Sequence, residues 1–174
     1  MLPAAYAWLV NEPGPKMLIE MLKIYGTLET PGSRDNPTIL AWAKEIGVEK
    51  DYVHDSIPWC GLAMGVVAKR AGKEFPKTPL WALSWAEFGT KQPHPMLGDV
   101  LVFKRDGGGH VTLYVGEDES AYHCIGGNQS DQVNVTRIGK SRLYAARRAP
   151  MTVPPANLRV VHLSGSGKLS TNEA

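Results

Sequence analysis

The chain has 174 residues, of which 43% are hydrophobic and 21% are charged, and its formal net charge is +2. This length suits one compact domain with its own core and leaves little room for a second domain. The charge is too small to indicate nucleic-acid binding, although it suits an anionic polymer such as a cell wall, and no stretch approaches the roughly 18 apolar residues of a membrane-spanning helix.

Residues 1–10 are apolar but contain no Lys or Arg, and no small-residue cleavage site follows them. This is not the pattern of a signal peptide, so we expect a protein made in the cytoplasm that needs outside help for any export. The two cysteines, Cys60 and Cys124, are too few for a disulfide framework. We therefore treat both as thiols.

The first half of the chain is predicted to be helical. Apolar residues recur at helical spacing, and Asn36 followed by Pro37 is a typical helix start, with Asn as the cap and Pro in the first turn. Glycines mark the helix ends. The predicted helices run from Pro15 to Tyr25, from Asn36 to Gly47, from Cys60 to Gly72 and from Leu80 to Phe88.

The second half of the chain has the pattern of β-strands separated by glycine-rich turns. The predicted strands cover residues 99–103, 110–115, 121–125, 132–138 and 143–148. Their short connections favour antiparallel pairing, so we expect an α+β fold with N-terminal helices packed on a C-terminal antiparallel sheet of about five strands. We expect a single domain over residues 1–153, followed by a partly disordered tail over residues 154–174.

Cys60 is the candidate nucleophile because the predicted helix places it near a helix N-terminus. A cysteine attacks as the thiolate, and the partial positive charge of a helix N-terminus favours that form. The unpaired N–H groups there can also stabilise a developing oxyanion. The alternative is a small buried structural cysteine, which is what we expect of Cys124 in the middle of its strand.

His110 is the candidate general base. It follows three glycines and opens an apolar strand, which would deliver its ring to the rim of the sheet. Asn128 ends the next strand, so two neighbouring antiparallel strands would place it beside His110 to orient the imidazole. A capping histidine and a turn asparagine remain the alternatives at these positions.

Four short motifs support this interpretation: Pro58-Trp59-Cys60-Gly61, Gly98-Asp99-Val100, Gly109-His110-Val111 and Gly126-Gly127-Asn128-Gln129. Their order, over about residues 13–148, resembles that of the CHAP and NlpC-type peptidoglycan hydrolases, and of small phage-encoded lysins in particular. The resemblance implies a papain-like fold in which Cys60 attacks a peptidoglycan amide, His110 moves the proton and Asn128 steers the ring. Many CHAP relatives carry an acidic residue just before this Asn, whereas this chain has glycines there.

Substrate contacts are expected from Trp59, Gly109 and Gln129, which adjoin the proposed catalytic residues. Trp81 and Trp85 could also face a groove, but tryptophans at helical positions usually belong to the core, and Trp59 is the best groove candidate because it precedes Cys60.

We expect no metal and no cofactor, because the five histidines show no zinc-binding spacing. Asp51, His54 and Asp55 form a polar cluster before the Cys60 helix. It is either a solvated, helix-capping loop or a calcium site of the kind described for some CHAP enzymes, although its spacing is not that of an EF-hand.

The first functional hypothesis is a monomeric peptidoglycan endopeptidase or N-acetylmuramoyl-L-alanine amidase, a phage endolysin that reaches the cell wall or periplasm through a holin-type hole. One alternative is an antibacterial cysteine amidase effector delivered by a secretion machine. Another, from a different class, is a non-catalytic wall-binding or phage structural module with the same fold.

Overall fold

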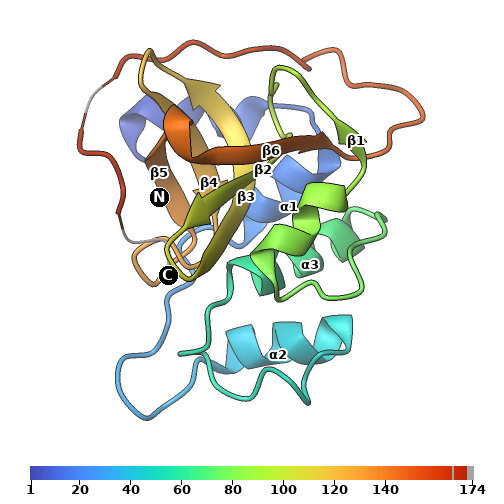
Figure 1. Ribbon diagram of the computed structural model, residues 1–174, viewed down its shortest axis with the longest axis vertical. Coiled ribbons are helices and arrows are strands. Elements are labelled where there is room, and N and C mark those ends of the chain that lie inside the picture. The colour runs from blue at the N-terminus through green and yellow to red at the C-terminus, as the bar shows by residue number, and fades with distance from the viewer. Residues whose placement is uncertain (166, 172–174) are drawn as a thin grey trace.

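The computed structural model describes residues 1–165 and 167–171 (Figure 1). Within these residues the α-helices come first and a six-stranded antiparallel sheet follows, which confirms the predicted α+β class. No helix in this described part of the chain has the length and apolar character needed to cross a membrane.

The described residues form three α-helices, α1 (Lys16–Lys23), α2 (Pro37–Ile46) and α3 (Cys60–Arg70), and each lies within a predicted range. Local sequence fixes both ends of α2. The Asn36 side chain accepts a hydrogen bond of 2.8 Å from the Thr38 N–H, and Gly47 ends the helix with a φ of 78°. A φ in this left-handed region favours glycine, which has no Cβ to clash.

Three 3₁₀ helices complete the helical set of the described chain: η1 (Ala4–Asn11), η2 (Ala82–Glu87) and η3 (Lys140–Arg142). The predicted helix over residues 80–88 corresponds to η2. At its end the Phe88 N–H donates to the Trp85 carbonyl, three residues back, which is the 3₁₀ pattern of short helical segments.

The sheet has the strand order β1-β6-β2-β3-β4-β5. Five of its strands correspond to the predicted ones, whereas β1 is an addition, because two residues are too few to show an alternating pattern. The strands are β1 (Thr90–Lys91), β2 (Val100–Arg105), β3 (Gly108–Glu117), β4 (Ala121–Gly126), β5 (Asn134–Gly139) and β6 (Leu143–Arg148).

Helix α3 is the centre of the main core. Every residue from Cys60 to Ala68 is buried, and the helix contacts α1, α2 and β3. A helix covered on all sides must be apolar all round, as this one is over its first nine residues. A smaller apolar cluster, which includes Phe103, Tyr114 and Cys124, packs separately. Cys124 therefore occupies a buried core position in the sheet.

The segment from Pro155 to Leu163 lies against the domain. The Leu97 N–H donates to the Arg159 carbonyl (2.9 Å), and Glu117 and Val161 are joined by a backbone hydrogen bond of 2.8 Å. The Leu163 N–H donates a second backbone hydrogen bond to the Glu117 carbonyl at 2.8 Å. In this stretch the short apolar run pairs with the end of β3, whereas partial disorder was expected for the tail over residues 154–174.

These contacts predict that deletion of residues from Pro155 onward destabilises the protein. The truncation exposes apolar core beneath Val161 and leaves the N–H groups of Leu97 and Glu117 without their partners. We expect the melting temperature to fall by at least about 5 °C in calorimetry. The control is Val153→Ala, which alters an 81% exposed side chain in the full-length protein; an unchanged melting temperature in the truncated protein would contradict the prediction.

Candidate active site

Cys60 is the first residue of α3, and its side chain is 3% exposed. The first turn of an α-helix leaves N–H groups without helical partners, so the thiol sits where the helix is most positive. Glycine is required at the next position. A Cβ on Gly61 would clash with the Pro79 carbonyl oxygen and lie 2.9 Å from that of Leu80. The segment at Pro79–Leu80 therefore packs directly on the start of α3.

His110 lies in β3, pairs with Phe103 of β2 and is fully buried. Because α3 contacts β3, the ring is brought to the Cys60 thiol. Burial alone would raise the pKa of Cys60, but the hydrogen bond and charge of His110, together with hydrogen bonds from the Val111 and Gly61 N–H groups, outweigh burial and lower it. The structure thus joins the two residues that the sequence placed 50 positions apart, in an arrangement that favours ionisation of the Cys60 thiol.

The hydrogen bond expected between Asn128 and His110 is made by Gln129 instead. His110 Nε2 and Gln129 Oε1 are 3.0 Å apart. Asn128 has a left-handed φ of 55° and is 3% exposed, and its Oδ1 has no hydrogen-bond partner among the described residues. In this turn after β4, where the Asn128 backbone is left-handed, it is the neighbouring amide of Gln129 that faces the ring.

Trp59, expected to line a substrate groove, is fully buried. Its ring packs against Trp42 at a centroid distance of 6.1 Å, and its Nε1–H donates to Glu29 Oε2 at 3.1 Å. The turn after β4 covers it, because a Cβ on Gly127 would lie 2.9 Å from the Trp59 ring. Trp59 is thus a core residue that supports the start of α3, and its expected substrate contact is not seen in the geometry.

Gly109, also expected to contact substrate, is covered by other residues. It is buried, and a Cβ there would lie 2.6 Å from Leu83 Cδ2, so the side chain of Leu83 packs on the backbone next to His110. Of the three residues expected to bind substrate, Trp59 and Gly109 are packed inside the protein, and Gln129 bonds to His110.

Trp81 is an exposed tryptophan in a segment that packs against this site. The segment from Pro79 to Leu83 touches both Gly61, next to Cys60, and Gly109, next to His110. Trp81 lies between these contacts in the chain and is 59% exposed. Its backbone is held, because its N–H donates to Thr78 and its carbonyl accepts from the Ser84 N–H at 3.0 Å. Spacing alone gave no reason to prefer Trp81 to Trp59 or Trp85.

The polar cluster before α3 ties two loops together. Asp55 is 1% exposed, and its Oδ2 accepts hydrogen bonds from the Thr30 and Asn36 N–H groups at 2.8 and 2.7 Å. His54 bonds to Asp35 at 3.2 Å. The described residues include no group of three or more His, Cys, Asp or Glu side chains placed to hold a metal ion. In this structure the Asp55 carboxylate therefore holds the loops around Thr30 and Asn36 together through its hydrogen bonds.

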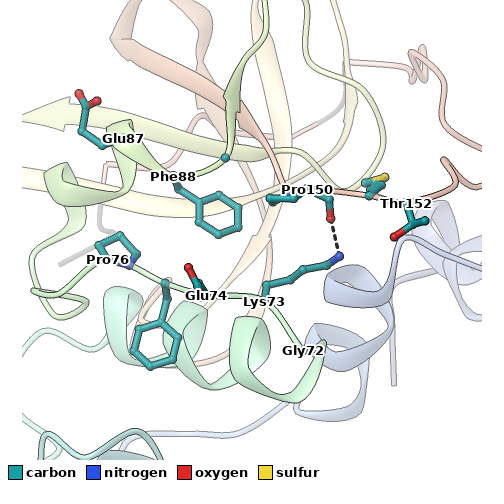
Figure 2. A pocket seen from close by; sticks show the side chains of 11 residues that line it. Gly72, Lys73, Glu74, Pro76, Glu87, Phe88, Pro150 and Thr152 are labelled. Carbon is teal, nitrogen blue, oxygen red and sulfur yellow. Dashed lines mark hydrogen bonds between the residues drawn. The ribbon is translucent and has the colours of Figure 1, made fainter.

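A hollow of about 700 Å³ lies at the other end of α3, beyond Gly72 (Figure 2). Phe88 and Pro150 form part of its wall, and the Lys73 ammonium donates to the Pro150 carbonyl across one side. None of its lining residues is a Cys, Ser or His. Neither Cys60 nor His110 lines it, so the hollow is separate from the Cys60 site.

Comparisons of this chain with protein-family models, with curated proteins and with solved structures found no match. The residues of the site nevertheless define its chemistry. A thiol with a lowered pKa at a helix N-terminus, an adjacent imidazole and an amide bonded to that imidazole are the parts that nucleophilic catalysis by cysteine needs.

Proposed function

We propose that this protein is a papain-like cysteine hydrolase that cuts amide bonds in bacterial peptidoglycan, as an endopeptidase or an N-acetylmuramoyl-L-alanine amidase. The observation that supports it most is the contact between Cys60 and His110, which lowers the pKa of the thiol in spite of its burial. A buried structural cysteine would have its pKa raised by burial.

In the proposed reaction, the Cys60 thiolate attacks the amide carbonyl carbon, and the carbonyl oxygen becomes an oxyanion. The N–H groups of the first turn of α3 are available to stabilise that charge. His110, protonated at Nδ1 by the thiol, passes this proton to the leaving amine as the C–N bond breaks. Water, deprotonated by His110, then hydrolyses the thioester and releases a carboxylate and the free thiol.

Peptidoglycan as the substrate rests on the ordered motifs around Cys60, His110 and Asn128. We further propose that the protein acts on the cell wall as a phage endolysin, without a metal or cofactor. An antibacterial effector would use the same chemistry and differ in its route to the wall.

Release of dye from labelled, purified peptidoglycan tests this function. We expect release by the reduced protein and none after alkylation of Cys60, with activity retained in EDTA. A protein that binds the wall without releasing dye, although its thiol is reduced, would instead be a non-catalytic wall-binding module. Inhibition by EDTA with rescue by zinc would overturn the thiol mechanism.

Trp81 should contribute to substrate binding in this reaction, since it is exposed in the segment that packs against Gly61 and Gly109. We expect Trp81→Ala to raise KM for solubilised peptidoglycan by roughly 2- to 10-fold, the range of one aromatic contact. The turnover number should change little, because the contact exists before and during reaction. Tyr144→Ala is the matched control: Tyr144 is 50% exposed and lies on β6. Equal effects of the two substitutions would exclude a specific role for Trp81.

A further inference from the structure

The Gln129 amide has only one orientation that satisfies its neighbours. Its nitrogen end lies 2.7 Å from the Asn134 carbonyl oxygen, 3.1 Å from Asn134 Oδ1 and 3.2 Å from the Cys124 carbonyl oxygen. Backbone carbonyls only accept hydrogen bonds, so the group that faces them must be the NH₂. The hydrogen-bond network therefore assigns the amide oxygen to the other end, where it faces His110.

An amide oxygen accepts hydrogen bonds and cannot donate them, so His110 Nε2, at 3.0 Å, must carry a proton. In the neutral ring this leaves Nδ1 as the unprotonated nitrogen. Nδ1 is buried and has no hydrogen-bond partner among the described residues. Because Nε2 is bonded to Gln129, Nδ1 is the ring nitrogen left to act on the neighbouring Cys60 thiol, whose pKa His110 lowers. This is the tautomer that can accept the thiol proton.

The position of Gln129 is fixed as well as its orientation. Asn134 Nδ2 donates to the Gln129 carbonyl at 2.8 Å, and the Gln129 N–H donates to the Gln132 carbonyl at 3.0 Å. Gln129 is 1% exposed, so water has no room to replace these partners. If the amide flipped, its NH₂ would face His110 Nε2 and its oxygen would face two carbonyls, which buried polar groups do not tolerate.

We propose that Gln129 is a positioning residue: its amide, held by the carbonyls of β4 and β5, keeps His110 as the Nε2–H tautomer with Nδ1 directed to Cys60. The proposal rests on the proposed pairing of Cys60 and His110. It assigns Gln129 to the catalytic histidine and removes it from direct substrate contact.

The test uses full-length Gln129→Leu and Gln129→Glu, with Asn128→Ala as the matched control because Asn128 is the adjacent buried amide and makes no hydrogen bond to His110. The ¹⁵N chemical shifts of the histidine ring report its tautomer without any substrate. We expect the Nε2–H tautomer in the wild type and in Asn128→Ala, and a loss of that single tautomer in Gln129→Leu. Peptidoglycan hydrolysis by Gln129→Leu should fall by about 10²-fold or more.

Gln129→Glu separates positioning from folding, because it is isosteric. The carboxyl oxygen that replaces the amide nitrogen in this variant must carry a proton to donate to the carbonyls of β4 and β5. We therefore expect this variant to retain more activity at acidic pH than Gln129→Leu and to lose it as the pH rises and the carboxyl ionises. Circular dichroism melting establishes that each variant is folded. If Gln129→Leu does not fold, the pH profile of Gln129→Glu tests the positioning role alone.

An unchanged tautomer in Gln129→Leu, or a pH profile of Gln129→Glu that matches the wild type, would overturn the positioning role. The tautomer measurement does not depend on peptidoglycan, whereas the pH profile does. If the wild type fails to cut peptidoglycan but shows the Nε2–H tautomer that Gln129→Leu loses, the proposed substrate is wrong and the positioning role of Gln129 is still supported.

Discussion

Cys60→Ser should abolish peptidoglycan hydrolysis, with a fall in turnover of at least about 10³-fold, while the protein remains folded. The serine hydroxyl has nearly the same size, but it is not ionised by the neighbouring imidazole, whereas the Cys60 thiol has a lowered pKa that favours the thiolate. Dye release from labelled peptidoglycan measures the loss, and circular dichroism melting measures folding.

Cys124→Ser is the control for this prediction. Cys124 is also buried, but it lies in β4 within the smaller apolar cluster and not at a helix N-terminus. We expect its hydrolytic activity to survive at a cost of about 1–2 kcal/mol in the free energy of unfolding, since a hydroxyl replaces a buried thiol. The assignment of the nucleophile is wrong if Cys124→Ser is inactive and Cys60→Ser retains activity.

His110→Ala should have a comparably large effect, about 10²- to 10⁴-fold in turnover, and should change how the Cys60 thiol titrates. In the wild type the pKa of Cys60 is lowered, so the reactive thiolate persists as the pH falls below the ordinary range of a free thiol, and is lost only as the pH passes through the lowered pKa. Without His110, burial remains as an opposing influence that raises the pKa, and the thiolate should form only at higher pH.

The pH dependence of the alkylation rate with iodoacetamide measures this shift. Cys124→Ser is the background for both proteins, so that a single thiol reacts. We expect the midpoint to move to higher pH on His110→Ala, and the losses from Cys60→Ser and His110→Ala in hydrolysis to be strongly non-additive, because both residues serve one step. Identical midpoints with and without His110 would show that the two residues are not coupled.

Much of the fold follows from local sequence, because local rules decide its elements. The cap at Asn36, the stop at Gly47 and the short apolar runs of β2 and β3 each depend on residues close together in the chain. The Cys60–His110 pairing was also predictable, since a helix N-terminus and the start of a strand each carry one chemically distinctive residue.

The features that sequence alone did not place depend on contacts between distant segments. The choice between Asn128 and Gln129 is decided by side-chain direction in a loop where Asn128 has a φ of 55°, and no sequence pattern fixes that angle. Likewise, Trp59 is buried by Gly127 and Trp42, while Trp81 stays exposed. The tail from Pro155 is held by backbone bonds to Leu97 and Glu117, and its short apolar run does not by itself identify these partners.

The most direct test of the central proposal is chemical analysis of purified peptidoglycan after digestion by the reduced protein. Each hydrolysed amide gains one water and yields one new amine and one new carboxylate, while the glycan bonds stay intact. Mass spectrometry of the amine-labelled fragments should therefore show new primary amines, no new reducing sugar ends, and no products with Cys60→Ser. The position of the new amine distinguishes amidase from endopeptidase cleavage. New reducing ends, or fragments that also form with Cys60→Ser, would contradict a cysteine amide hydrolase.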